Sequence, residues 1–469
     1  MSAGRKYLNK KEVRNKMKEL KILTPVGMLG YGFPPEDLRR GMEMDPDAVI
    51  LDSGSTDPGP YMLGTGATLC KPRAYERDLG LILDGIGDRK IPLLIGSAGG
   101  AGTHDQVEYI AGVIKDICRE KGLHKKIVKI YADIPKDTVM GKLREGKVHS
   151  CQSSPEATGK DVEESVSIVA QMGEEPFLKA IEAYPDYDII VAGRAYDPSP
   201  YAAYCHSNGI TDPGIYWHMG KTMECGAFCC EKKGQVIMAA VREDSFDLEP
   251  MDPANRCTKI TVAAHTLYEK TRPDRLPGPG GVLNLDTSQY EQITDRKVRV
   301  SGSTFEPSET YQIKLEAAAV VGYRSMFIGG VRDPILIGQL DSFLDMVRKY
   351  VEQLYPEVKD GIARIDFHIY GKNAVMEDWE PEKNAVPHEV GILGEVTAPT
   401  QELASAICSN TRIAVLHGPY PGQLATGGNL ALPLNPPDNP LGPVCRFSLY
   451  HTMDVEDPAE LFPFTMEEV

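Results

Sequence analysis

The first half of the chain alternates short apolar runs with amphipathic stretches, and this alternation limits the fold more than any other feature. Strand-type runs lie at 21–27, 48–54, 91–97, 126–134 and 186–194, with helix-type stretches between them. The runs are almost continuously apolar, which is typical of parallel strands that helices cover on both faces. The sequence therefore predicts an α/β fold with a doubly wound, mostly parallel sheet.

The pattern changes after residue 232, where β-rich segments follow one another with fewer helices between them. The proline- and glycine-rich stretch 272–292 predicts a long loop. From residue 335 onward, a helix, two strands, a helix and a strand predict an α+β portion of ferredoxin-like type. We therefore expect an α/β ligand-binding domain at 1–232, a β-rich segment at 233–332 that packs on it or completes it, and a C-terminal α+β domain at 333–469.

Charge and cysteine usage exclude some classes of protein. The 469 residues carry a formal net charge of −16, which repels phosphate backbones, so we expect no nucleic acid partner. No run approaches the length of a membrane span, and the basic, polar start does not resemble a secretory signal. The 10 cysteines are scattered without a framework spacing. Free thiols in the cytoplasm are the expectation.

A glycine-rich turn follows the third strand. It runs from Gly96 to Gly102 and lacks both the lysine of a P-loop and the GxGxxG spacing of a dinucleotide turn. Glycines allow backbone N–H groups to approach a ligand, and the positive end of the next helix points to the same place. The turn predicts either a cradle for a carboxylate or phosphate, or a tight connection that needs positive φ angles.

Polar residues follow four of the predicted strands, at the sheet edge where ligands bind in doubly wound folds. Helix caps explain an Asp or Ser at each place. They do not explain Arg194, because arginine is a poor cap and a good clamp for a carboxylate. A shared anion-binding site is therefore predicted. It includes Asp52, Ser53, Ser55, Asp57, Ser97, Gly99, Gly100, Gly102, His104, Arg194 and Asp197, while Asp133 also follows a strand.

The segment 217–233 predicts a helix that places His218, Lys221 and Cys225 near one face, with Glu224 beside them. A glutamate in an apolar surround suits acid or base catalysis. Two metal sites come into consideration. The CxxxCC run at Cys225, Cys229 and Cys230 lacks a second ligand pair, which favours buried thiols over zinc. The aspartates at 52, 57, 133 and 197 are suited to a hard cation such as Mg²⁺, although carboxylates are common at strand ends.

Several segments, in order from about residue 20 to the tail, carry a family resemblance: ILTPVGMLGYGF, LDSGSTDPGP, GSAGGAGTH, VAGRAYDPSPYAA, HMGKTMECGA and KVRVSGS. Together they resemble the acyclic terpene utilisation family, AtuA. ILTPVGMLGYGF replaces a glycine motif of the best-known branch, so the resemblance is to a divergent branch. It implies a catabolic enzyme or enzyme subunit acting on carboxylic acids or their CoA esters, with a small partner protein encoded nearby.

These observations lead to one functional hypothesis and two alternatives. The hypothesis is a lyase of hydratase or dehydratase type that moves a proton α to a carboxylate or thioester. Its catalytic residues are Asp52, His104 and Glu224, and the other residues of the predicted site bind substrate. The first alternative is a non-catalytic ligand-binding or scaffold subunit of a two-protein enzyme. The second is a nucleotide-dependent enzyme, which the missing lysine argues against. We expect a homo- or hetero-oligomer.

Overall fold

Five parallel strands form the centre of the first half of the chain, as the sequence predicts. Their spatial order is β1-β2-β3-β7-β4, and their short Val-, Ile- and Leu-rich segments are buried on both faces. The computed structural model describes residues 19–151, 154–267, 272–425 and 427–469. The strands are β1 (Leu20–Thr24), β2 (Ala48–Asp52), β3 (Leu93–Gly96), β4 (Lys126–Ile130) and β7 (Ile189–Ala192).

Antiparallel strands extend this sheet at both edges to 10 strands among the described residues. On one side, β8 pairs with β1, and β9, β13 and β12 follow. On the other side, β19 pairs with β4, so the last described strand completes a sheet that begins at residue 20. The added strands are β8 (Ile237–Val241), β9 (Ser245–Pro250), β12 (Gln289–Gln292), β13 (Val298–Ser301) and β19 (Phe464–Glu468).

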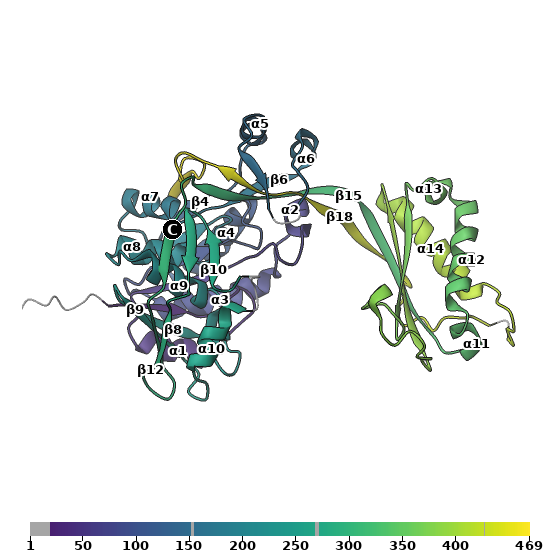
Figure 1. Cartoon of the computed structure of the whole chain (residues 1–469), viewed down its shortest axis with the longest axis horizontal. Coiled ribbons are helices and arrows are strands. Elements are labelled where there is room, and N and C mark those ends of the chain that lie inside the picture. The colour runs from purple at the N-terminus through teal and green to yellow at the C-terminus, as the bar shows by residue number, and fades with distance from the viewer. Residues whose placement is uncertain (1–18, 152–153, 268–271, 426) are drawn as a thin grey trace, which may run out of the picture. The chain divides into compact units, whose positions relative to one another are not determined.

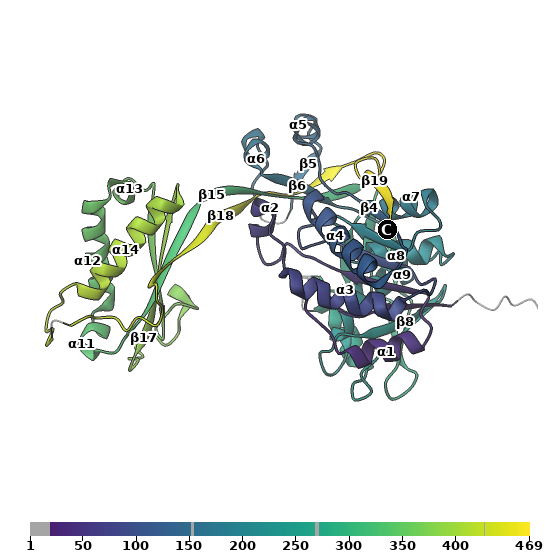
Figure 2. The same cartoon turned by 180° about the vertical axis from the view of Figure 1, so that it is seen from behind.

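Helices cover both faces of the sheet and form two separate apolar cores (Figures 1 and 2). One face carries α1 (Pro35–Glu43), α3 (Pro72–Ile86) and α4 (His104–Lys121). The other carries α7 (Glu175–Ala183), α8 (Ser199–Ser207) and α9 (Pro213–Met223). In α3, Leu and Ile at helical spacing bury one side of the helix against the strands, whereas α8 and α9 are buried on nearly all sides.

The neighbouring strands β3 and β7 send their following helices to opposite faces. The chain leaves β3 for α4 on one face, and it leaves β7 for α8 on the other. In doubly wound sheets such a switch point opens a crevice at the carboxyl ends of the strands, and ligands bind there. The loops after β3 and β7 are those that carry the glycine turn and Arg194.

Two local predictions are wrong. The stretch 272–292 is not a long loop, because it contains the hairpin β10 (Arg275–Gly278) and β11 (Gly281–Asn284), whose Leu276 and Leu283 are buried. Gly280 adopts φ +73° in the hairpin turn, so proline and glycine here mark a turn and not an unstructured loop. The helix predicted through residue 233 ends at Met223, and a short 3₁₀ helix, η1 (Gly226–Cys229), follows.

The remaining elements of the first half are short. A small three-stranded sheet joins the β10–β11 hairpin to β14 (Thr304–Pro307), and β6 (Ser167–Gln171) pairs with the long strand β15 (Gln312–Val331). These short elements of the first half are α2 (Tyr61–Thr65), α5 (Lys136–Arg144), β5 (Val148–Ser150), α6 (Gly159–Glu164), β6 (Ser167–Gln171), α10 (Lys259–Ala264), η2 (His265–Leu267) and β14 (Thr304–Pro307).

The chain forms two compact units, one up to Ala318 together with Phe447–Val469 and the other Ala319–Arg446. Their boundaries lie elsewhere than the predicted divisions at 232 and 332. The second unit has the order strand, helix, strand, strand, helix, strand, and the sheet order β16-β17-β15-β18, which is ferredoxin-like as predicted. It consists of the parts of β15 (Gln312–Val331) and β18 (Asp438–Asp454) that lie within 319–446, together with α11 (Pro334–Ile337), α12 (Leu340–Leu354), α13 (Pro356–Lys359), β16 (Arg364–Tyr370), η3 (Glu377–Trp379), β17 (Val390–Ala398) and α14 (Gln401–His417).

Among the described residues, no helix combines the length and the apolar character that crossing a membrane requires.

Candidate active site

The loops after β2, β3 and β7 meet at the switch point. The hydroxyl of Ser53, after β2, accepts a hydrogen bond of 3.1 Å from the backbone N–H of Gly99. The backbone N–H of Ser97 donates to the carbonyl of Gly193, and that of Arg194 donates to the carbonyl of Gly102. Backbone hydrogen bonds therefore fix the predicted strand-end residues of three loops in one place.

The glycine turn owes its composition to this close packing. Gly99, Gly100 and Gly102 have φ angles of +72°, +124° and +67°, which favour glycine. A Cβ on Gly102 would lie 2.1 Å from the backbone nitrogen of Arg194. The N–H of Gly99 is used by Ser53, and that of Gly100 donates to the carbonyl of Ser97. The turn thus serves as a tight connection, and the amides of Ser97, Ala98, Gly99 and Gly100 all bond within the chain.

Arg194 is buried, with only 3% of its surface exposed, and its guanidinium is the centre of the cluster. Nη1 donates to the hydroxyl of Ser97 at 3.1 Å and lies 3.4 Å from a carboxylate oxygen of Asp197. Nε donates to Glu316 at 2.7 Å. Nη2 donates to no residue that the structure describes. The guanidinium is therefore held on two sides and retains donor capacity on the third.

Glu316 is the buried counter-charge of Arg194. It comes from β15, where it is fully buried, and it also lies 2.9 Å from Lys314 on the same face of that strand. Burial alone raises the pKa of a carboxyl, but the charges of Arg194 and Lys314 outweigh burial and lower the pKa of Glu316 to about 2. Burial also opposes the charge of Arg194, yet Glu316 and Asp197 raise its pKa. Both groups are charged at neutral pH.

Asp52 is a buried acid at the end of β2. Burial raises its pKa well above the ordinary value, and the negative charges of Asp197 and Glu224 add to the shift, against the opposing effect of Arg194. One oxygen accepts a 3.4 Å hydrogen bond from the N–H of Gly54. The other, Oδ1, is buried and has no hydrogen-bond partner among the described residues. Asp52 thus combines a proton held to unusually high pH with an unsatisfied oxygen.

Glu224 directly follows Met223, the last residue of α9. It lies close enough for its negative charge to raise the pKa of Asp52. Its Oε1 accepts a hydrogen bond of 2.5 Å from the ammonium of Lys221, one turn earlier, and its Oε2 accepts one of 3.1 Å from the Cys225 thiol. All three side chains belong to the segment that the sequence singles out. Lys221 stabilises negative charge on Glu224.

His104, Ser55 and Asp57 lie outside this cluster. His104 is exposed at the start of α4, where its ring stacks on Tyr131 at 4.5 Å and acts electrostatically on Asp133. Ser55 accepts a hydrogen bond from the backbone N–H of Asp57, which is exposed. The structure therefore brings together Asp52, Ser53, Ser97, the glycine turn, Arg194, Asp197 and Glu224, whereas no hydrogen bond, ion pair or ring contact among the described residues joins the side chains of His104, Ser55 and Asp57 to them.

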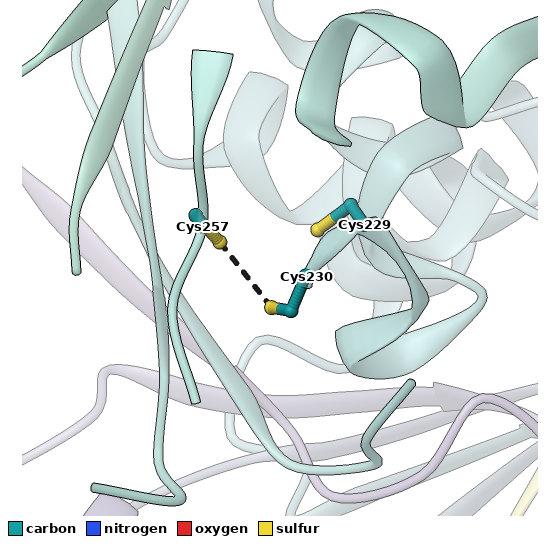
Figure 3. Close-up of side chains that lie close together, drawn as sticks. All are labelled: Cys229, Cys230 and Cys257. Atoms are coloured by element: carbon teal, nitrogen blue, oxygen red, sulfur yellow. Dashed lines mark hydrogen bonds between the residues drawn. The ribbon is translucent and has the colours of Figure 1, made fainter. Parts of the chain in front are cut away.

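The structure groups possible metal ligands differently from the two sets that the sequence suggests. Among the described residues, the group of three or more close His, Cys, Asp or Glu ligands is formed by Cys229, Cys230 and Cys257, and not by aspartates (Figure 3). Cys225, which the sequence groups with the first two, bonds to Glu224 instead. His218 is a fully buried core residue, and burial lowers its pKa to about 3.

Two surface hollows lie away from the cluster. One, of about 410 Å³, is lined by residues of α1 and α3, and the other, of about 490 Å³, by residues of α12. Neither is lined by a residue of the predicted site, which is marked instead by its buried polar groups.

The sequence does not predict two residues of the cluster, Tyr201 and Glu316. Tyr201, in α8, is fully buried and hydrogen-bonds to Thr24 at 2.9 Å, and the charges of Glu224 and Asp52 act on it. Glu316 comes from a distant strand. The available signal for Glu316 is a pair of charges at 314 and 316 within the apolar run of β15, since alternate residues share one face of a strand.

Comparison with known proteins agrees with the resemblance in the sequence. No curated protein and no solved structure matches the chain. The model of the acyclic terpene utilisation family protein AtuA matches residues 72–244 and 245–431, which include Arg194, Glu224 and Glu316. The chain therefore belongs to the AtuA family, whose part in terpene utilisation gives it a catabolic role.

Proposed function

We propose that this protein is a catabolic lyase of hydratase or dehydratase type, acting on a small carboxylic acid or an acyl-CoA ester. The observation that carries the proposal is Asp52, a buried acid whose charged neighbours at the switch point are Asp197, Glu224 and Arg194. Carboxyl groups with different surroundings at one ligand crevice are a common basis for acid–base assignments.

The two catalytic roles follow from the surroundings of Asp52 and Glu224. Asp52 retains its proton to unusually high pH and is suited to donate it. Glu224 accepts hydrogen bonds from Lys221 and Cys225, which suits it to act as the base. In the dehydration direction, Glu224 removes the proton α to the carbonyl. Asp52 protonates the hydroxyl on the β carbon, so that water leaves and a carbon–carbon double bond forms.

Arg194 and Ser97 are the proposed binding groups for the substrate carboxylate or thioester oxygen. The guanidinium has a donor, Nη2, that no described residue uses, and Glu316 fixes its orientation from the other side. A preorganised donor of this kind stabilises negative charge that develops on a carboxylate or an enolate. His104, which the sequence suggests as a third catalytic candidate, has no part in this scheme.

Exchange of the α proton with solvent tests the proposal, because exchange requires the base but not completion of the reaction. Thermal shift against di- and tricarboxylates, branched acids and acyl-CoA esters first identifies a ligand, since a ligand of the native state raises the melting temperature. Deuterium incorporation into that ligand is then followed by NMR in D₂O. We expect exchange with the wild type and a loss of about 10²–10⁴-fold in Glu224→Gln.

Asp52→Asn should retain exchange and lose dehydration, because Asp52 serves the leaving hydroxyl. Asp133→Asn is the matched control, since Asp133 is also a partly buried acid of raised pKa that follows a strand of the same sheet. A wild type that binds a ligand but exchanges no proton, with or without a partner protein, would contradict the lyase proposal and favour a non-catalytic binding subunit.

A further inference from the structure

Three cysteine thiols meet in the interior of the first unit. They come from η1 (Cys229), the next residue (Cys230) and the segment before α10 (Cys257) (Figure 3). All three residues are buried, and their sulfur atoms lie within 4.8 Å of one another. The Sγ atoms of Cys230 and Cys257 are 3.4 Å apart.

The backbone holds these thiols together. Cys230 and Cys257 form an antiparallel bridge, and the N–H of Glu231 donates to the carbonyl of Arg256 beside it. The N–H of Cys257 donates to the carbonyl of Arg296, so the segment that contains Arg296 also holds Cys257 in position. The positions of the sulfur atoms are therefore set by the fold and not by flexible side chains alone.

A positive charge lies near the three thiols. The guanidinium of Arg296 acts electrostatically on Cys230, and a nearby positive charge stabilises a thiolate. Arg296 is itself fixed, because its guanidinium donates to the carbonyls of Asn255 and Asp252. A thiolate is the form of cysteine that binds metals.

We propose that Cys229, Cys230 and Cys257 bind a single thiophilic metal ion of the Zn²⁺ type. Four-coordinate zinc with Zn–S bonds of about 2.3 Å places its sulfur ligands roughly 3.8 Å apart, which agrees with the separations here. Thiolates select zinc, copper(I) and iron–sulfur centres over hard cations. The sulfur atoms are too close together to surround a multi-iron cluster, so a single ion remains. The described residues supply three ligands, so a non-protein ligand is expected at the fourth position of zinc.

The site differs from the proposed active site in its ligands and in its role. Cys229 lies five residues after Glu224, and η1 connects the two. A metal ion that joins η1 to the segment before α10 would fix the path of the chain directly after the proposed base. The expected role is stabilisation of this part of the fold, as for structural zinc in other proteins.

Metal content of the full-length chain, purified without a metal-binding tag, is the first test. We expect about one Zn²⁺ per chain, lost on dialysis against a chelator under reducing conditions and recovered on addition of ZnCl₂. Replacement by Co²⁺ should give a thiolate-to-cobalt charge-transfer band. A chain without metal that takes up neither ion, or a Cys230–Cys257 disulfide found by peptide mass spectrometry in the freshly purified protein, would overturn the proposal.

Variants identify the ligands. Cys257→Ala should lose at least 10-fold in Co²⁺ affinity and the intensity of the charge-transfer band, while Cys118→Ala, a buried cysteine of α4, should retain both. If Cys257→Ala does not fold, the wild type settles the question through protection from alkylation. Alkylation should label three fewer thiols in the metal-bound chain than in the metal-free chain. Equal labelling of the two forms would contradict the site.

Discussion

Glu316 sets the charge balance of the cluster, because it is the buried partner of both Arg194 and Lys314. Glu316→Gln leaves two cations near each other without this counter-charge, and breaking a buried ion pair in this way costs about 3–5 kcal/mol. We expect that loss in the free energy of unfolding, measured by urea denaturation. Glu306→Gln, which removes the exposed partner of Arg275, is the control and should change stability little.

A loss in Glu316→Gln no larger than in the control would show that the ion pair contributes nothing beyond an ordinary surface contact.

The raised pKa of Asp52 predicts a pH dependence of stability with a definite sign. The native state holds this proton more tightly than the unfolded chain, whose aspartate pKa is about 3.9. The favourable contribution is therefore complete below about pH 3.9 and is lost as pH rises toward the native pKa. Asp52→Asn removes this dependence, so its stability relative to the wild type should increase with pH.

Urea denaturation at a series of pH values from acidic to mildly alkaline measures the difference. Asp57→Asn is the control, because Asp57 is exposed and lies in the same loop. A constant difference between wild type and Asp52→Asn would show that Asp52 ionises normally in the native state.

At the scale of elements, the turn after β3 depends on glycine for two separable reasons, backbone angle and space. Gly102 and Gly122 have nearly equal φ angles of +67° and +64°, but a Cβ at Gly122 meets nothing within 4 Å. Gly122→Ala should therefore cost only the left-handed backbone penalty of about 1–2 kcal/mol. Gly102→Ala should cost more, because its Cβ would collide with the backbone of Arg194.

Thermal unfolding and ligand binding of the two variants measure this difference. Gly102→Ala should also weaken binding of any ligand that needs Arg194. Equal losses of stability in the two variants would contradict the close approach of the two loops.

The parallel strands are predictable because their signal is local. Each is a run of four or five residues rich in Ile, Leu or Val, and all five lie where the sequence predicts them. Arg194 is predictable for a related reason, since an arginine directly after a strand has no capping role. Its partner Glu316 is not predictable, because the contact joins residues 122 positions apart.

The same limit applies to the other missed contacts. Cys257 is a lone cysteine in the sequence, and the antiparallel bridge to Cys230 that completes the thiol group is visible only after folding. The hairpin at 275–284 was hidden because proline and glycine are typical of both loops and tight turns.

At the scale of the whole molecule, the apolar cores divide as the two units do. The two large cores of the first unit contain no described residue from 319–446, and the core of the second unit lies entirely within that range. Replacing residues 319–446 by a short Gly/Ser turn between β15 and β18, which are neighbours in their sheet, should leave the first unit folded. It should retain the ligand-induced rise in melting temperature.

Differential scanning calorimetry of the shortened chain, with the full chain as the control, checks this expectation. A shortened chain without a cooperative transition would show that the first unit requires the second in order to fold.

The pairing of β19 with β4 has a consequence for synthesis on the ribosome. The outer edge of β4 stays unpaired until its partner strand β19 is synthesised, and β19 is translated more than 300 residues later. At about 5–20 residues per second, this interval is roughly 20–70 s, during which the nascent chain presents an unpaired strand edge. Messenger RNAs truncated before codon 464 would yield chains that lack β19, so the edge of β4 would remain unpaired. These chains should accumulate in inclusion bodies.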